Sequence, residues 1–542
     1  MDEAISKHIF LFPFKWEVKS DKNTENTSLL ARTNLAGFKK TLDKNLWQEY
    51  TFSIKEPEAR ELNPYNEYAY FYDHVRTILN LVENADSYQY NYKIPKEKKA
   101  IYRISILGET PEMALELEID DIFLNFYDSG VAVFGFILTN RLVTSFARVL
   151  KINEYGRRIY PQFLKASTYN DKEEKVGLTL DTKFNFLADK VELIGLHNKT
   201  IEEKFEHYDT YAKLGADPFK LPAHIGELVG NNFKTGAYNT LATGDIKVTP
   251  IIDDRMFVMS FLFENSVVKK LSEFCIGKEE YTYLNSNEWF RYVFIDDSNP
   301  SCTSQVMKRK LLAGCTYDRW VGNIDKDGKD TSHLFGISRY SFVMLSADEW
   351  FTRNIIYLHF SNMYFQIVLL SLVQRASIIS YAGEVTRIVD KIKKDEVLSD
   401  QEIRDINSLA QSFLVFKNQI YFREITPQDQ GIEIYNIVHQ QMNIKNEVEA
   451  LETEIEDLIG YVNTASDARR GKEAQILTRL ATWFLPAGFI IGMMSINAYD
   501  ADNMVWGGRI DWAAWGWIAF AIALSYLCGR LILNYINKKI KN

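Results

Sequence analysis

The stretch Ile476–Asn497, ILTRLATWFLPAGFIIGMMSIN, decides how this chain is organised. It is apolar almost throughout and carries one charged side chain, Arg479. At a rise of about 1.5 Å per residue, a helix of this length spans roughly 30 Å, the thickness of the hydrocarbon core of a bilayer. A second uncharged run covers Trp512–Gly529. The two runs predict a hairpin of transmembrane helices over 476–497 and 512–533, joined by an outer loop over 498–511.

The charges around this hairpin predict its orientation. Basic residues flank it on both sides: Arg469, Arg470, Lys472, Arg530, Lys538, Lys539 and Lys541. The loop instead carries Asp500, Asp502 and Asp511 against Arg509 alone. Because basic flanks stay in the cytoplasm, we expect a protein of the inner (plasma) membrane with both termini cytoplasmic, including the basic tail 534–542. The lipid bilayer is thus an expected partner.

Composition limits the functions of the remaining chain. The chain has 542 residues, of which 25% are charged, and its net charge is −9. A chain of this length is expected to contain two or three domains. An acidic balance argues against binding to polymeric nucleic acid, which favours basic surfaces. The four cysteines form no C-x-x-C pair and are expected to be reduced cytosolic thiols, and the N-terminus is no signal peptide.

Residues 1–345 are expected to form a cytoplasmic α/β domain, which we interpret as a sensor. Aromatic and β-branched runs predict strands over 8–14, 47–54, 88–94, 101–107, 246–252, 256–263 and 289–295. The clearest unit is 113–138, where Asp128-Ser129-Gly130 turns an alternating strand into an apolar strand expected at the centre of a sheet. A helix is expected over 141–150.

Three helices are expected after this domain. Ser346 and Ser399 each begin an S-x-x-E capping box, which predicts paired helices within 346–425, over 347–395 and 400–424. Thr426-Pro427 predicts the start of a third helix, which we expect to continue through a stalk over 426–475 into the first span.

The run 355–373 is apolar enough to be considered as a further span. Its polar residues His359, Asn362 and Gln366 argue against this interpretation. A third span would also place the lysine-rich C-terminus outside the cell.

A heptad seam runs along the expected stalk. It consists of Ile444, Val448, Leu451, Ile455, Leu458 and Val462. The seam would pack against the two preceding helices of the same chain or near the axis of a symmetric oligomer, and both arrangements remain open.

The first span also resembles a known family. From Thr482 it reads T-W-F-L-P-A-G-F-I-I-G-M-M-S-I-N, which is similar to T-x-F-L-P-x-T-F-I-x-G-x-x-G-M-N in the CorA family of divalent cation channels. The short acidic loop, second span and lysine-rich tail agree with that family. Ser495-Ile496-Asn497 stands where the family has Gly-Met-Asn, and Gly488 stands where it usually has threonine. These departures put the family's usual selectivity for Mg²⁺ in doubt.

The resemblance implies a homopentamer whose first span lines a pore for Mg²⁺ or another divalent cation, with no covalent cofactor. Spacing places Leu477, Leu485, Gly488 and Gly492 on one helix face, so five copies of Leu485 would form an apolar constriction that gates by dewetting. Five Asn497 side chains beside Ser495 would offer oxygens to a hydrated cation at the outer mouth. Asp500 and Asp502 would attract cations there.

The large region before the helices resembles a further branch of CorA-like proteins. Members of that branch sit beside type III CRISPR systems and are regarded as membrane effectors triggered by a nucleotide second messenger in antiviral defence. The resemblance therefore implies a channel gated by a small anionic or nucleotide ligand. The best candidate site in the sequence is Arg157 and Arg158 beside Tyr155 and Tyr160, because guanidinium groups bind phosphates bidentately and stack on bases. The alternative is a surface helix end with solvated arginines.

Other candidate sites are weaker. Asn323-x-Asp325-x-Asp327-Gly328 has the start of a calcium loop, but Leu334 stands at its twelfth position, so we expect a polar hairpin turn. Glu203 and His207 are one helical turn apart and lack a third metal ligand.

The sequence contains no convincing nucleophile–base arrangement, and we do not expect an enzyme. The alternatives to a ligand-gated channel are a constitutive Mg²⁺/Co²⁺ transporter regulated by cytoplasmic metal, and a membrane-anchored receptor or enzyme with a non-conducting hairpin.

Overall fold

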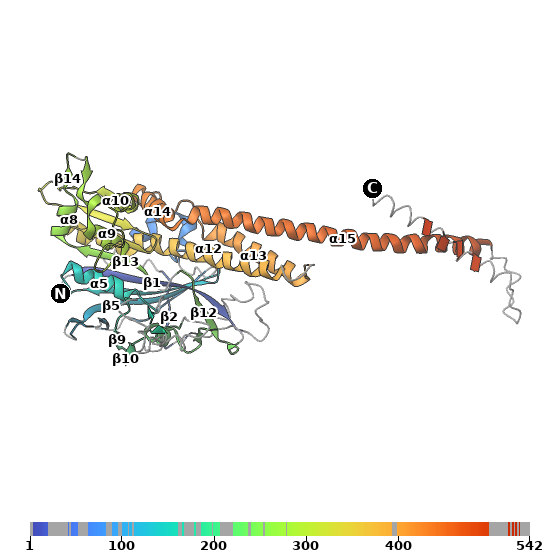
Figure 1. The fold of residues 1–542 in the computed structure, drawn as a ribbon, viewed down its shortest axis with the longest axis horizontal. Helices are drawn as coiled ribbons and strands as arrows, with labels where there is room; N and C mark the ends of the chain where they lie inside the picture. The colour runs from blue at the N-terminus through green and yellow to red at the C-terminus, as the bar shows by residue number, and fades with distance from the viewer. Residues whose placement is uncertain are drawn as a thin grey trace, which may run out of the picture. The chain divides into compact units, whose positions relative to one another are not determined.

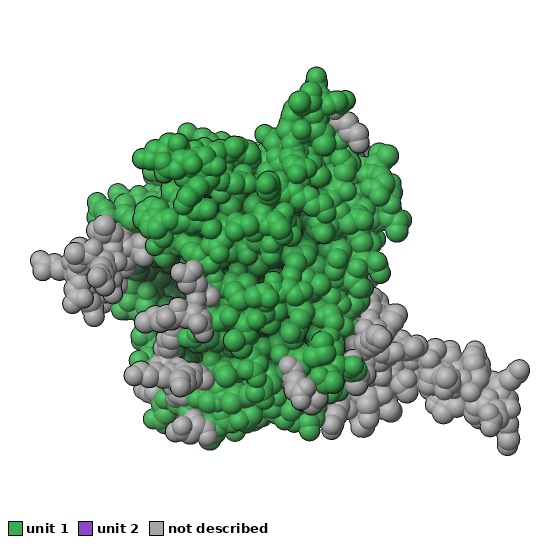
Figure 2. Space-filling model, turned by 90° about the vertical axis from the view of Figure 1, so that its left-hand side faces the viewer, with its two compact units in different colours: residues 1–394, 400–455 green, residues 395–399, 456–542 purple. Residues whose placement is uncertain are grey.

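The computed structural model divides the chain into two compact units. Unit 1 comprises 1–394 and 400–455 and is green in Figure 2, and unit 2 comprises 395–399 and 456–542. The structure describes residues 4–19, 42, 45–52, 63–82, 89–95, 100–106, 108–110, 113–160, 165–166, 178–179, 186–197, 199–205, 220–236, 240–252, 255–277, 279–392, 398–497, 519–520, 523–524, 526–527 and 530–531.

Unit 1 is built on a 14-stranded mixed sheet. Its strands are β1 (Ser6–Val18), β2 (Gln48–Glu49), β3 (Gln89–Lys93), β4 (Ile101–Ser105), β5 (Leu115–Tyr127), β6 (Val131–Asn140), β9 (Lys190–Leu196), β10 (Lys199–Glu203), β11 (Phe233–Lys234), β12 (Ile246–Pro250), β13 (Phe257–Phe263), β16 (Thr316–Trp320), β17 (His333–Ile337) and β18 (Ser341–Ser346). Two further pairs lie outside it: β7 (Lys165–Ala166) with β8 (Leu178–Thr179), and β14 (Phe274–Cys275) with β15 (Glu280–Tyr281).

The helices of the described residues follow the same chain order. They are α3 (Asn63–Tyr70), α4 (Asp73–Arg76), α5 (Phe146–Gly156), α7 (Ala223–Val229), α8 (Asn265–Leu271), η4 (Thr282–Asn285), α9 (Asn287–Phe294), α10 (Gln305–Cys315), η5 (Thr352–Ile356), α11 (Tyr357–His359), η6 (Phe360–Tyr364), α12 (Phe365–Ile392), α13 (Asp400–Gln419), α14 (Asp429–Met442) and α15 (Ile444–Asn497). The expected mixed α/β region followed by helices is confirmed.

The centre of the sheet is formed by β5, β6 and β1, which pair antiparallel in that order. Gly130, with φ of +77°, closes the turn between β5 and β6, so the predicted hairpin and the central position of its second strand are confirmed. Side chains alternate along β1: Phe10, Phe12 and Phe14 join the large core under α5, α7 and α9. The opposite face receives α12, which contacts β1 and β6. The centre of the sheet is thus buried on both faces.

Thr352–Ile392 is the one helix among the described residues that is long and apolar enough to cross a membrane. It contains two π-helical segments, η5 and η6. In unit 1 it packs against the sheet as well as α13 and α14, and Figure 1 shows α12 and α13 running along the sheet. The apolar side chains of this helix therefore pack in the protein core, which agrees with the argument from its polar residues against a further membrane span.

Three local predictions are wrong. The run 289–295 forms α9 instead of a strand, because Ser286 caps it by accepting a hydrogen bond from the Trp289 N–H at 3.2 Å. The helix expected over 141–150 is α5 and begins at Phe146. Ser346 ends strand β18 rather than capping a helix, and the Thr352 hydroxyl accepts the Glu349 N–H instead at 3.1 Å.

The helix expected to run unbroken from 427 to 497 is interrupted. α14 ends at Met442, the following residue Asn443 has a left-handed φ of +58°, and α15 begins at Ile444. Asparagine tolerates this conformation better than other non-glycine residues. Its side chain also donates to Glu447 Oε1 at 2.9 Å in the first turn of α15.

The part of the α15 heptad seam that belongs to unit 1 is buried there. Its residues Ile444, Val448, Leu451 and Ile455 have exposed fractions between 0% and 3%. Lys417 of α13 also forms an ion pair with Glu452 of α15. This part of the seam has cover within unit 1, so its apolar pattern is no evidence for an oligomer.

The later part of α15 contrasts with this seam. Residues 467–481 are all exposed, and so are the large apolar side chains of Ile476, Leu477, Leu480, Phe484 and Leu485. A helix with apolar side chains around its circumference is stable only where lipid or other helices cover it. This segment therefore needs surroundings that the described residues of the chain do not supply.

Unit 1 also contains a histidine held neutral by burial. His224 of α7 is fully buried, neither ring nitrogen has a hydrogen-bond partner, and its ring stacks on Phe136 with centroids 6.1 Å apart. Burial lowers the pKa of His224 to about 3 from an ordinary 6.5. The unfolded chain binds this proton more readily, so the stability contributed by the neutral ring is present above pH 6.5 and is lost as pH falls toward 3.

We predict that His224→Leu removes part of the acid sensitivity of folding. Between pH 7.5 and pH 5 the wild-type protein should lose about 2 kcal/mol of unfolding free energy through this group, and the variant should not. Urea unfolding of the full chain in detergent at both pH values measures the difference. His74 is exposed, so His74→Leu is the control and should keep the wild-type pH dependence. Equal pH dependence in all three proteins would contradict the prediction.

Candidate functional site

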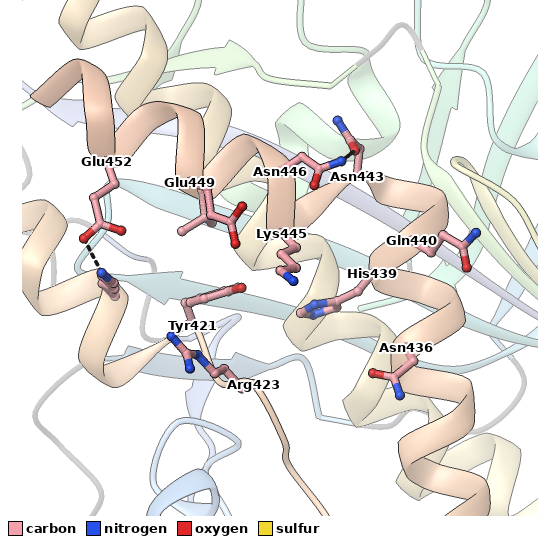
Figure 3. Close-up of a pocket in the computed structure, with 12 residues that line it drawn as sticks. Tyr421, Arg423, Asn436, His439, Gln440, Asn443, Lys445, Asn446, Glu449 and Glu452 are labelled. Atoms are coloured by element: carbon pink, nitrogen blue, oxygen red, sulfur yellow. Dashed lines mark hydrogen bonds and ion pairs between the residues drawn. The ribbon is translucent and has the colours of Figure 1, made fainter.

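A groove of about 590 Å³ opens where α13, α14 and α15 meet in unit 1. It is lined by Lys417, Tyr421, Arg423, Asn436, His439, Gln440, Asn443, Lys445, Asn446, Val448, Glu449 and Glu452. Figure 3 shows these residues coming from the end of α13, the segment after it, α14 and the first turns of α15. The groove thus spans the helix break at Asn443.

His439 forms a fixed, neutral part of the groove wall. Its Nε2 lies 2.8 Å from Gln374 Oε1, while Gln374 Nε2 donates to Ile420 O at 2.8 Å. Burial lowers the pKa of His439 to about 3, so the ring is uncharged at neutral pH. Because Gln374 Oε1 can only accept, the His439 proton resides on Nε2. The ring also stacks on Tyr421, with centroids 6.2 Å apart and planes at 16°.

The charges of the groove favour an anion. Three basic side chains, Lys417, Arg423 and Lys445, face two acidic ones, Glu449 and Glu452. Lys417 is paired with Glu452, whereas Arg423 and Lys445 form no ion pair with any described residue. A guanidinium and an ammonium group beside an aromatic ring and several amides suit a phosphate or carboxylate attached to a flat group.

The structure places the arginines predicted to bind a ligand in the protein core. Arg157 and Arg158 are buried. Arg157 Nη2 donates to Glu154 Oε2 and Arg158 Nη2 donates to Glu154 Oε1, each at 2.7 Å. Arg157 also donates to Ile295 O at 3.1 Å. Tyr155 is buried too, with its ring 6.2 Å from that of Phe186.

This geometry gives the two arginines a structural role. Burial lowers the pKa of Arg157 to about 10, and the carboxylate of Glu154 opposes this shift. Tyr160 is partly buried and packs against the core. That these residues bind an anion stays a prediction, for which the arrangement provides no support.

The predicted pore residues lie on one continuous helix. Leu477 and Leu485 are exposed on α15, and a Cβ added at Gly488 or Gly492 would meet nothing within 4 Å. Ser495 and Asn497 belong to the last turns of α15, but their side chains lie outside the description. Asp500 and Asp502 lie outside the described residues, as do the loop 498–511, most of the second span and the basic tail.

The two weaker metal-like patterns have structural roles. Asp325 Oδ1 accepts the N–H groups of Asp327 and Lys329 at 2.9 and 2.8 Å, so the polar hairpin turn is confirmed. Glu203 accepts the N–H groups of Phe205 and Ala223, each at 2.5 Å, while His207 lies outside the described residues. Within the described part of the chain, no three His, Cys, Asp or Glu residues are placed to hold a metal ion.

The groove was missed by the sequence analysis. Its residues come from four segments, and no fixed spacing links them. The only signal is the density of amide and histidine side chains over 436–446, which also suits a solvated helix surface.

Comparisons with known proteins add little to this picture. No known family profile matches the chain. No curated protein is detectably similar to it either. Among solved structures, one described as the structure of the full-length CmaX protein aligns over 51% of this chain and 88% of that chain, with 13% sequence identity and a TM-score of 0.18. A TM-score this low does not establish a shared fold.

We predict that Glu154→Gln destabilises the protein by about 3–5 kcal/mol, because it leaves two buried guanidinium groups without a full counter-charge. Denaturant unfolding of the full chain measures this loss. The matched control is Glu118→Gln, since Glu118 pairs with Arg141 at 2.8 Å in a partly exposed position. The Glu118→Gln variant should lose less than about 1 kcal/mol of unfolding free energy. Equal losses for the two variants would show that the buried pair is not structural.

Proposed function

We propose that this protein is a CorA-like homopentameric ion channel of the inner membrane, which passes divalent cations when a ligand binds its cytoplasmic region. The observation that carries the proposal is the continuity of α15. One helix of 54 residues contains the buried seam, a polar exposed middle and an apolar end whose large side chains are exposed. Such an end requires lipid on one side and helices on the other, which a pore-lining helix in a bilayer has.

The polar middle of α15 supports assembly around an axis. Residues 467–475 are exposed and include Arg469, Arg470 and Lys472. A polar helix segment without neighbours gains little stability beyond its own hydrogen bonds. Copies of the same helix around an axis would supply those neighbours, in agreement with the homopentamer that the CorA resemblance implies.

The groove of Lys417 to Glu452 supports ligand gating. A ligand shifts a two-state channel only through its different affinities for the open and closed forms. A change from about 1% to 99% open requires roughly 5.5 kcal/mol. Over five equivalent grooves this is roughly 1.1 kcal/mol each, less than one charge-assisted hydrogen bond supplies. We assign the groove to a small anionic ligand, of which a nucleotide second messenger is the candidate.

The pore assignment is tested by Leu485→Gln. A polar side chain at the constriction should remove the dewetting barrier and raise Mg²⁺ leak into proteoliposomes severalfold, while native mass spectrometry in detergent should still give a pentamer. Leu480→Gln is the control, because Leu480 is also exposed but points about 140° away around the helix. Equal flux in both variants and the wild type would indicate a non-conducting anchor, and a monomer or dimer would exclude the symmetric pore.

The groove is tested by the double change Arg423→Ala and Lys445→Ala. Titration calorimetry with ATP as the anionic probe should show at least a tenfold loss of affinity, because two charge-assisted contacts are removed. The control double variant changes Lys269 and Lys270, the exposed basic residues of α8, and should bind like the wild type. Unaltered ATP binding in the first variant would place the ligand elsewhere. A wild-type channel that is fully open without any ligand would favour the constitutive transporter.

A further inference from the structure

A second cavity, of about 340 Å³, lies in unit 1 between the sheet and the start of α12. The floor of the cavity consists of β3 and β5, and its walls include Tyr50, which follows β2, and Glu67 of α3. The segment η6 and the first turns of α12 cover it. Apolar side chains, among them Phe123 and Phe365, fill part of this lining. It is separate from the groove around Asn443 and shares no residue with it.

The floor of this cavity is polar. In the register of β3 and β5, Asn91 lies opposite Asn125 and Gln89 opposite Tyr127, all lining the cavity. Polar side chains beneath a core helix cost free energy unless they meet partners. Gln89 Nε2 meets one, the Thr77 carbonyl oxygen, at 3.4 Å, so Asn91 is the floor residue that calls for an explanation beyond folding.

The charged side chains at this site have an excess of one negative charge. Lys93 pairs with Asp121 at 2.9 Å, and Lys7 with Asp120 at 3.7 Å. Glu67 accepts a hydrogen bond from Gln366 Nε2 at 2.9 Å and has no basic ion-pair partner among the described residues. Burial raises the pKa of Glu67, as expected for a carboxylate that lacks full compensation. A positive charge placed near Glu67 would supply the missing compensation.

Asn91 provides an independent sign of a missing donor. Its side chain is only 6% exposed, lines the cavity, and its Oδ1 has no hydrogen-bond partner. A buried acceptor without a partner costs about 1–3 kcal/mol. The cover of the cavity also contains the π-helical segment η6, a distortion that is often found at functional sites.

We propose that this cavity binds a small organic cation, a protonated amine whose N–H groups donate to Glu67 and Asn91 Oδ1 and whose apolar body packs against the aromatic lining. Both groups are acceptors, which selects a donor-bearing cation over an anion. The mixture of apolar wall and few polar contacts is typical of small-molecule sites. The amine would connect α3 and β3 to α12, and its binding requires neither a pore nor a pentamer.

The test uses the full-length protein in detergent and titration calorimetry with two probes, tyramine and 1,4-diaminobutane. At least one should bind the wild-type protein. 4-Ethylphenol, which has the ring of tyramine without its amine, should not. Glu67→Gln keeps an oxygen for Gln366 and removes the charge, so it should weaken amine binding at least tenfold. Asn91→Leu should also weaken it, and it replaces an amide whose Oδ1 has no partner with an apolar group of similar size.

The control is Glu118→Gln, which removes a carboxylate from β5 outside the cavity and should bind like the wild type. The thermal unfolding of each variant shows whether it is folded, and Asn91→Leu remains informative if Glu67→Gln is not. The proposal is overturned if neither amine binds the wild-type protein, if both cavity variants bind as the wild type does, or if MgCl₂ displaces the amines at equal concentration. None of these outcomes depends on ion flux, so they leave the proposed channel function to its own tests.

Discussion

Gln374 connects the sheet-bound helix α12 to the end of α13 and to α14. It is fully buried in α12, the helix that rests on the central strands β1 and β6. Its Nε2 donates to Ile420 O after α13 and to the Tyr435 hydroxyl of α14 at 3.1 Å, and its Oε1 accepts from His439. One amide thus fixes the sheet, the end of α13 and the wall of the groove relative to one another. A buried amide that satisfies several partners favours a single arrangement of the helices.

The sequence predicted those parts of the fold in which local pattern and burial agree. The β5–β6 hairpin was identifiable because alternation, a Gly130 turn and an apolar run all point to the same structure. The strand predicted over 289–295 was wrong because the aromatic residues of this run favour a strand by propensity. Ser286 caps a helix here, and Trp289, Tyr292 and Val293 are spaced so that they share its buried face. Here tertiary packing overrides propensity. The break at Asn443 was missed since one left-handed residue leaves the heptad spacing on its C-terminal side intact.

The candidate sites were less predictable, for a related physical reason. Arg157 and Arg158 were predicted to bind an anion because guanidinium groups bind phosphates bidentately and stack on bases. Their counter-charge was present in the sequence as Glu154, three and four residues earlier, at the spacing of neighbours on a helix. The groove and the amine cavity are formed by contacts between distant segments, and no local pattern records them. Burial, which decides whether a charge binds a ligand or a neighbour, is a property of the folded chain.

Asn443 is the position at which ligand binding and helix geometry would be coupled in the proposed channel. A left-handed residue costs roughly 1–2 kcal/mol, and less for asparagine. Alternative backbone conformations at this residue are therefore separated by energies similar to the roughly 1.1 kcal/mol that each of five grooves would have to supply. The groove contains Asn443 itself, with Gln440 before the break and Lys445 after it. An anion held between α14 and α15 would favour one backbone conformation over another, and an unbroken helix would transmit the difference from Ile444 onward.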